Sequence, residues 1–148
     1  MEWTRGNFTI STDDERLDRA AIRDFLGGSY WARAIPQQIV DRSIDGSLNF
    51  GLYEGAAQVG FARIITDRAT FAYVCDVYVL KSHRGRGLAR WLMDVVRGHP
   101  DLQGLRRWVL LTRDAHSLYR QVGFQDVEDA SRYMEIVDRD VYTRRGPE

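Results

Sequence analysis

Residues 77–96, VYVLKSHRGRGLARWLMDVV, decide the fold of this chain. The stretch opens with β-branched and aromatic residues, which favour a strand, and is then interrupted by Gly85 and Gly87. Apolar residues resume at the i, i+3, i+4, i+7, i+8 spacing of one helix face, at Leu88, Trp91, Leu92, Val95 and Val96. The stretch therefore predicts a strand that leads through a glycine-rich turn into a helix, with a ligand site at the junction.

The turn has the residues of an anion site. Gly85 and Gly87 allow positive φ and close approach of another molecule. No Ser, Thr, Asp or Asn directly precedes Gly87, so the first N–H groups of the helix lack a predicted cap. Such amides carry partial positive charge and, beside Arg84 and Arg86, would suit a phosphate or pyrophosphate. A helix start whose amides bond only to water would have the same residues, so the pattern alone leaves both interpretations open.

Two common phosphate-binding patterns fit this turn poorly. A P-loop requires Lys followed by Ser or Thr after its last glycine, whereas Leu88 and Ala89 follow Gly87. A dinucleotide fingerprint requires a small residue where Arg90 stands. The turn therefore belongs to a different class of site.

Composition restricts the class of protein. A length of 148 residues, 44% of them hydrophobic, predicts one domain with a substantial core. A formal net charge of +0 argues against nucleic acid or an anionic membrane as a partner. A single cysteine, Cys75, and an N-terminus without an apolar leader segment predict a reducing, cytoplasmic location. The three histidines and Cys75 show no metal-ligand spacing, so we expect no metal.

The remaining elements follow from periodicity and turn residues. A capping-box pattern from Thr12 to Glu15 predicts the start of a first helix, Pro36 starts a second, and Asp114 is a plausible cap for a short one. The run at 69–80 is apolar on both alternating faces except for Asp76, as in a central strand. Strands are expected at 8–10 (an edge strand), 48–53, 58–65, 69–80, 108–111, from 124, and at 132–137, ahead of a charged tail from about 138.

This order of elements resembles that of the GNAT superfamily of acyl-CoA-dependent N-acyltransferases. Residues 84–89, RGRGLA, match the superfamily's Q/R-x-x-G-x-G/A pattern, and residues 115–124, AHSLYRQVGF, match its A-x-x-L-Y-x-x-x-G-F segment. The resemblance covers roughly residues 8–137. It implies an α+β (mixed α/β) fold, with a central, mostly antiparallel sheet and helices on both faces, in a single domain over 1–148.

The resemblance also implies acetyl-CoA as cosubstrate, lying against the strand before the turn. Its pyrophosphate would sit on the amides of the turn, and a backbone N–H near Val79 would hold the thioester oxygen. The chain departs from the family at Thr112, where many members carry Asn toward the pantetheine arm. The implied cofactor-binding residues are Val77, Tyr78, Val79, Arg84, Gly85, Arg86, Gly87, Leu88, Ala89 and Thr112.

Two residues are candidates for proton transfer. Tyr119 matches the family's tyrosine, and a phenol with a usual pKa of about 10 is protonated at neutral pH, so it could donate to the leaving thiolate. The alternative is a tyrosine that packs in the core. Asp76 is the best-placed carboxylate for a base; the alternative is an ion pair with Arg63 or Arg113.

The predicted activity is transfer of an acetyl group from acetyl-CoA to a primary amine of a small molecule or peptide, by direct attack in a ternary complex. The alternative is a non-catalytic acyl-CoA-binding sensor or regulatory module. Tyr30 and Trp31 follow the first helix, where the superfamily forms part of its acceptor pocket, and are the candidate substrate contacts. An edge strand at 132–137 could support a homodimer.

Overall fold

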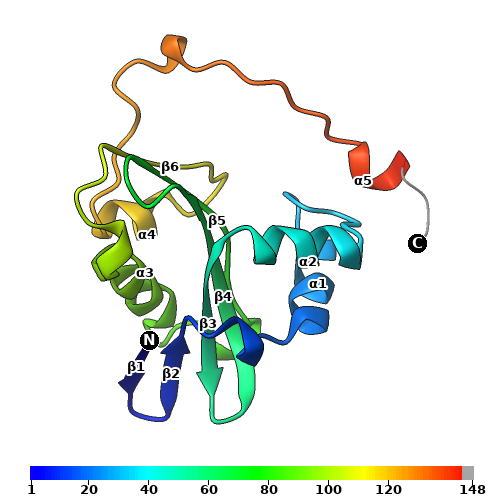
Figure 1. Ribbon diagram of the computed structural model, residues 1–148, viewed down its shortest axis with the longest axis vertical. Coiled ribbons are helices and arrows are strands. Elements are labelled where there is room, and N and C mark those ends of the chain that lie inside the picture. The colour runs from blue at the N-terminus through cyan, green and yellow to red at the C-terminus, as the bar shows by residue number, and fades with distance from the viewer. Residues whose placement is uncertain (145–148) are drawn as a thin grey trace.

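A six-stranded sheet with helices on both faces forms the body of the protein (Figure 1). The computed structural model describes residues 1–144. All neighbouring strands are antiparallel except β5 and β6, which are parallel, so the predicted α+β fold with a mostly antiparallel sheet is confirmed. The strands, in spatial order, are β1 (Glu2–Arg5), β2 (Phe8–Ser11), β3 (Leu48–Glu54), β4 (Ala57–Thr66), β5 (Phe71–Val79) and β6 (Arg107–Leu110).

The helices divide the core into two clusters, one on each face of the sheet (Figure 1). Among residues 1–144 the α-helices are α1 (Arg19–Gly27), α2 (Gln37–Asp45), α3 (Leu88–Gly98), α4 (His116–Gln121) and α5 (Val141–Arg144). Residues of α1 and α2 pack with Phe61 and Tyr78 of the sheet. Residues of α3 and α4 pack with Phe50 and Val74 on the opposite face.

A bulge in the middle of β5 exchanges the two faces of that strand. Asp76 has φ 55°, and the pairing of β4 with β5 shifts register between Phe61 and Arg63. Val74 belongs to the core under α3, whereas Tyr78, also an even-numbered position, belongs to the core under α1 and α2. An extra residue reverses the two-residue period, so the prediction of one uninterrupted alternation through 69–80 was wrong.

Three further predictions differ from the structure: the edge strand of the sheet, the start of α1 and the cap of α4. The edge of the sheet is β1, which pairs with β2, and not the strand at 8–10. The segment after Thr12 forms only a 3-10 turn, η1 (Asp14–Arg16), and α1 starts later, where the Asp18 side chain accepts from Ala21 N. Asp114 does not cap α4. Several polar side chains in this stretch could cap a helix. In the structure Asp13 caps η1 and Asp18 caps α1.

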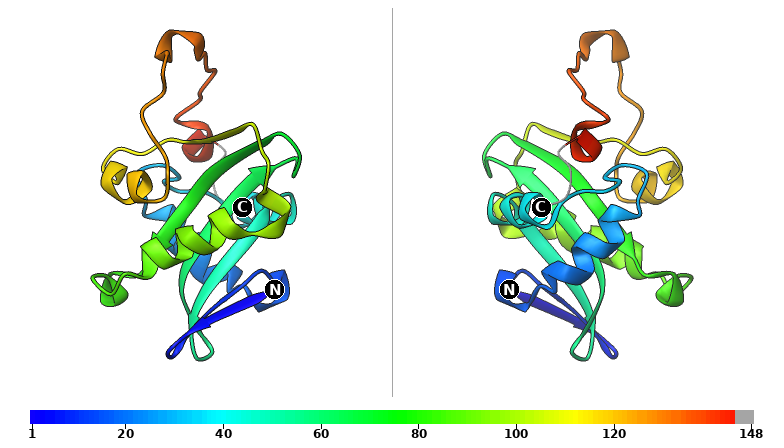
Figure 2. Two further views of the ribbon diagram at one scale, coloured as in Figure 1. Left: turned by 90° about the vertical axis from the view of Figure 1, so that its left-hand side faces the viewer. Right: turned by 90° about the vertical axis from the view of Figure 1, so that its right-hand side faces the viewer.

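The C-terminal part differs most from prediction. No strand forms from 124 or at 132–137; the chain instead has a 3-10 turn, η4 (Ala130–Arg132), in an otherwise irregular segment. We call residues 125–140 the C-terminal arm. Figures 1 and 2 show it rising from α4, projecting beyond the body and returning at α5, where Tyr142 packs against the core under α1 and α2. The predicted charged tail thus contains the short helix α5, and its residues 145–148 lie outside the described residues.

Within residues 1–144, no helix is long and apolar enough to cross a membrane. The second helix begins one residue later than predicted, with Pro36 as its N-cap, and ends before Gly46. The hairpin between β3 and β4 turns at Gly55. The assignment of 1–148 to one domain stays a prediction.

Candidate functional site

The site begins where β5 and β6 separate. The two strands pair only between Phe71–Val74 and Arg107–Leu110. Beyond Val74 the outer edge of β5 has no ladder partner in the described part of the chain. Leu80 N donates toward β4, to Val59 O at 2.8 Å. Because successive amides of a strand point to opposite edges, the N–H groups of Val77 and Val79 point away from β4, toward the gap left by β6.

A cleft of about 1100 Å³ lies where the two strands separate. It lies between the end of α1 with the loop after it, the separated half of β5, and the start of α4. The structure brings together eight of the predicted site residues around it. They are Tyr30, Trp31, Val77, Tyr78, Val79, Arg84, Ala89 and Tyr119.

The glycine turn has the predicted backbone conformation. Gly85 has φ 79° and Gly87 has φ 73°, and Gly87 occupies the N-cap position of α3 without a side-chain cap hydrogen bond. Leu88 is buried, so only its backbone can serve a ligand there. The Arg84 side chain turns back and donates from Nε to Val79 O at 3.1 Å. The turn therefore combines free helix amides with a guanidinium directed along the β5 edge.

Arg5, at the end of β1, reaches the same turn from the other end of the chain. Its Nη2 donates to Arg86 O at 3.4 Å, and its guanidinium lies 4.9 Å from the ring centre of Trp91. No local signal in the sequence points to Arg5, because only the pairing of β1 with β2 carries it to the start of α3. Arg86 itself lies 3.8 Å from Glu54 at the β3–β4 hairpin.

Tyr119 is buried at the inner wall of the cleft. Its side chain is part of the core under α3, and the residue is 9% exposed. Burial, with smaller contributions from Tyr30 and Asp114, raises the pKa of Tyr119 to about 12. The phenol therefore stays protonated across the physiological range and can only donate a proton there.

Asp76 is engaged on both carboxylate oxygens. Trp31 Nε1 donates to Oδ1 at 3.0 Å, and Arg63 Nε donates to Oδ2 at 2.7 Å. Burial lowers the pKa of Arg63, but the charge and hydrogen bond of Asp76, with smaller contributions from Cys75 and Tyr142, together raise it above its ordinary value. Of the two arginines considered as partners, Arg63 makes the contact. Asp76 thus fixes the bulge of β5 to Trp31, and it does not line the cleft.

Tyr30, Trp31 and Arg113 form the outer wall of the cleft. The guanidinium of Arg113 lies 3.9 Å from the Tyr30 ring centre, and Arg113 N donates to the Tyr30 hydroxyl at 3.1 Å. The rings of Tyr30 and Trp31 meet edge to face, and they are 48% and 42% exposed. Sequence analysis weighed Arg113 only as a partner of Asp76; its contact with Tyr30 joins segments 83 residues apart and leaves no local signal.

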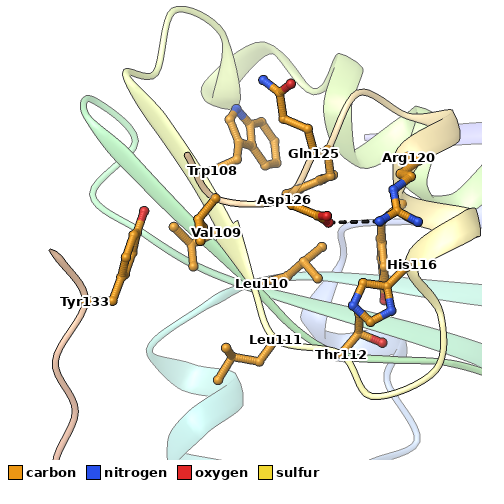
Figure 3. A pocket seen from close by; sticks show the side chains of 13 residues that line it. Trp108, Val109, Leu110, Leu111, Thr112, His116, Arg120, Gln125, Asp126 and Tyr133 are labelled. Carbon is orange, nitrogen blue, oxygen red and sulfur yellow. Dashed lines mark hydrogen bonds and ion pairs between the residues drawn. The ribbon is translucent and has the colours of Figure 1, made fainter. Parts of the chain in front are cut away.

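Thr112 lies in a second, smaller hollow. Its Oγ1 accepts from Ala115 N at 3.1 Å, so the hydroxyl stabilises the start of α4. This hollow, about 340 Å³, lies between β6, α4 and the chain after α4, and Tyr133 reaches its rim (Figure 3). Tyr119 lines both the hollow and the cleft. A contact of Thr112 with a cofactor stays a prediction.

The Cys75 thiol is hydrogen-bonded within the sheet, beside Arg63. Burial raises the pKa of the Cys75 thiol to about 12, as expected for a packed small side chain, and Sγ donates to Arg63 O at 3.3 Å. Among residues 1–144, no three His, Cys, Asp or Glu side chains are grouped so that they could hold a metal ion.

Comparison with known proteins identifies the class. Residues 45–126 match the family model described as the acetyltransferase (GNAT) domain. The chain therefore belongs to the GNAT family of acetyltransferases and is an acyltransferase. It is 34% identical over 153 residues to a protein of Gibberella zeae named "Putative acetyltransferase", covering 87% of this chain and 85% of that protein.

Solved structures share the fold. A protein of Xanthomonas campestris pv. campestris, described as belonging to the GNAT family, is 47% identical with a TM-score of 0.89, over 92% of this chain and 96% of that one. An acetyltransferase of Clostridium acetobutylicum, solved with acetyl-CoA, is 15% identical with a TM-score of 0.61, over 88% of this chain and 95% of that one. At 15% identity the likeness concerns the fold alone.

Proposed function

We propose that this protein transfers an acetyl group from acetyl-CoA to a primary amine of a small molecule or peptide, by direct attack of the amine in a ternary complex. The observation that carries the proposal is the outer edge of β5 beyond Val74, which has no strand partner among residues 1–144. This edge leads through residues 80–87 to the start of α3, where Gly87 makes no side-chain cap hydrogen bond. An extended pantetheine arm can pair with such an edge as an added strand while its pyrophosphate meets helix amides.

The proposed position of acetyl-CoA follows from this edge. The pantetheine amides pair with the backbone of β5 around Val77, and the pyrophosphate lies on the amides of 84–89. The Val79 N–H, directed into the cleft, donates to the thioester oxygen. A hydrogen bond that strengthens as this oxygen becomes an anion contributes about 3 to 4 kcal/mol in enzymes that depend on it.

The chemical step needs two proton movements. The amine nitrogen attacks the carbonyl carbon, a tetrahedral intermediate forms, and the carbon–sulfur bond then breaks. We assign to Tyr119 the donation of its hydroxyl proton to the departing thiolate; its raised pKa keeps that proton available. The nitrogen loses its proton toward solvent at the open mouth of the cleft, where Tyr30 and Trp31 are partly exposed.

The contacts of Asp76 favour positioning over general-base catalysis. Both of its oxygens already accept hydrogen bonds, from Trp31 and Arg63. A carboxylate held by these two hydrogen bonds keeps the bulge and the Trp31 ring in place. We therefore assign to Asp76 the orientation of the acceptor side of the cleft, and its role as a base stays a prediction.

The test measures release of free coenzyme A thiol from acetyl-CoA with a panel of primary amines. We expect turnover with the wild type and a loss of kcat of about 100-fold or more in Tyr119→Phe, because an acid of this kind contributes about 10² to 10⁴ in rate. The dissociation constant for acetyl-CoA should stay within about twofold, since the ring that packs in the core is kept. Tyr73→Phe, on β5 but outside the cleft lining, is the matched control.

Two outcomes would contradict the proposal. Tight acetyl-CoA binding without thiol release across the whole panel would identify a binding module instead of an enzyme. Unchanged turnover in Tyr119→Phe would assign the acid to another group. A further check is the pH profile: with a phenol pKa near 12, kcat should show no decline up to pH about 10, where an unperturbed tyrosine would be half ionised.

A further inference from the structure

Two arginines of the cleft have no carboxylate partner among residues 1–144. Arg33 lies in the loop after α1, and Arg113 lies between β6 and α4. Both line the cleft, and neither forms an ion pair with a described aspartate or glutamate. Positive charge that the protein leaves uncompensated beside a cleft attracts a ligand of the opposite sign. The acceptor side of the cleft therefore has a charge preference to which the proposed reaction assigns no role.

The guanidinium of Arg113 is held against Tyr30. It lies 3.9 Å from the centre of the Tyr30 ring, and Arg113 N donates to the hydroxyl of the same tyrosine at 3.1 Å. A guanidinium that stacks on an aromatic ring with its flat face keeps the N–H groups along its edge available. These N–H groups form the planar fork that binds a carboxylate or a phosphate through two parallel hydrogen bonds.

Backbone hydrogen bonds fix the loop that carries Arg33. Before Arg33, Ala32 N donates to the buried Ser29 hydroxyl at 3.1 Å. After it, Ala34 N donates to Gly27 O at 3.0 Å. The residues on both sides of Arg33 are therefore tied to the end of α1 and to the start of the loop, which keeps the Arg33 side chain at the cleft.

The carboxylates that line the cleft do not cancel this positive charge. Asp24 Oδ1 lies 3.5 Å from Arg23 Nη1, so Asp24 already has a partner of its own. Asp114 contributes to the raised pKa of Tyr119, so its charge acts at the phenol on the inner wall. A second positive charge on the acceptor, as in a diamine, would therefore meet two guanidinium groups, whereas an anionic group would be attracted by both.

We propose that the acceptor carries an anionic group, a carboxylate or a phosphate, in addition to its primary amine, and that Arg113 binds this group at the outer wall of the cleft. Arg33 adds positive charge from the loop after α1. The amine of the same molecule then points inward, toward the thioester and Tyr119. This inference rests on the proposed acetyl transfer and names the class of its acceptor.

Matched pairs of amines test the charge preference. One series compares amino acids with their amides, and the other compares O-phosphorylated amino alcohols with the parent alcohols. With kcat/KM expressed per free amine, we expect the anionic member to be preferred by about tenfold to 100-fold in one series, the range for one hydrogen bond to a charged group. That series identifies the anion as carboxylate or phosphate, and the preference should shrink at high salt. Equal values within every pair, or a preference for the uncharged members or for 1,4-diaminobutane, would overturn the inference.

Substitution of the two arginines tests whether they are the binding groups. Arg113→Gln should reduce the preference for the anionic member by about tenfold, mainly through KM, because the contact is made in the ground state and in the transition state alike. Arg113→Lys keeps the charge but loses the planar fork, so it should retain part of the preference. Arg33→Gln should reduce the preference by about threefold, the scale of an exposed charge pair.

Arg42→Gln is the matched control, because Arg42 is an exposed arginine of α2 that does not line the cleft. Its preference should equal that of the wild type. Arg33 and Arg113 are both exposed, so their variants should fold, which melting profiles check. An unchanged preference in both folded variants, Arg113→Gln and Arg33→Gln, would overturn the assignment of the site.

Calorimetric titration separates this inference from the proposed function. The protein is mixed with coenzyme A and titrated with both members of each pair, so binding is measured without acetyl transfer. Tighter binding of the anionic member that is lost in Arg113→Gln supports the inference, and if no amine is turned over, only the proposed activity fails. Turnover of amines with equal rates and equal binding within each pair overturns the inference and leaves the proposed activity in place. Absence of both binding and turnover would overturn the two together.

Discussion

The two walls of the cleft are built in different ways. The wall formed by β5 and the start of α3 comes from one continuous stretch, residues 77–89, and it offers mainly backbone groups. The opposite wall joins the loop after α1, the segment after β6 and the start of α4, and it offers side chains. A site made of backbone depends on local conformation, which glycine and strand propensity determine. A site made of side chains depends on which segments the fold brings together.

The largest effect is expected from a change to the wall formed by β5 and the start of α3, which we call the backbone wall. Gly87→Val places a β-branched residue at φ 73°, where L-residues are strained, and puts a side chain beside the amides of α3. We expect kcat/KM for acetyl-CoA to fall by about 100- to 1,000-fold, through strain and lost anion contacts. Steady-state kinetics and calorimetric titration with coenzyme A measure this.

Gly98→Ala is the control for that change. Gly98 ends α3, has no positive φ, and an added Cβ would meet nothing within 4 Å. Its kinetics should match the wild type. Wild-type affinity for coenzyme A in Gly87→Val would contradict the view that backbone conformation forms this wall.

An intermediate effect is expected from Asp76, which pairs with Arg63 of β4 and accepts a hydrogen bond from Trp31 of the opposite wall. Asp76→Asn leaves the buried charge of Arg63 uncompensated, while Asn still tolerates the φ of 55°. We expect the free energy of unfolding to fall by about 2 kcal/mol, the scale for removing one partner of a buried charged hydrogen bond. Urea unfolding measures it.

Two further variants sharpen this result. Arg63→Met combined with Asp76→Asn should recover much of the loss, since no charge is then left unpaired. Asp94→Asn breaks an exposed pair with Arg90 and should cost less than about 0.5 kcal/mol. If folded Asp76→Asn loses kcat as strongly as Tyr119→Phe, Asp76 acts as the base and the positioning role is wrong.

The smallest effect is expected from a substitution in the opposite wall, formed by the loop after α1, the segment after β6 and the start of α4. Tyr30→Ala removes the ring under the Arg113 guanidinium and the hydroxyl that accepts from Arg113 N. We expect KM for the amine to rise by about tenfold, the loss typical of one contact at a partly exposed site, with acetyl-CoA affinity unchanged. Phe71→Ala, which changes a partly exposed aromatic outside the cleft, is the control. A matching loss of acetyl-CoA affinity would show that the two walls are not independent.

Features that depend on local sequence were predicted correctly, whereas features that depend on tertiary contacts were not. The strand, turn and helix of residues 77–96 were predicted correctly, because glycine spacing and the helical period are local properties. The start of α1 was misplaced, because two acidic caps compete there. A strand at 132–137 was predicted from composition, but the described chain gives it no partner, and a strand does not form without one.

By itself, the sequence determined the two glycines with positive φ and the amphipathic α3 behind them, because φ restrictions and hydrophobic periods act between near neighbours. The mostly antiparallel sheet was expected from the resemblance of the chain to the GNAT superfamily. Only the tertiary structure decided that Asp76 pairs with Arg63 and Trp31, that Arg5 reaches the turn, and that Arg113 packs on Tyr30. These contacts join residues far apart along the chain. The bulge in β5 and its separation from β6 set where Asp76, Trp31, Tyr30 and Arg113 meet, and the pairing of β1 with β2 carries Arg5 to the turn.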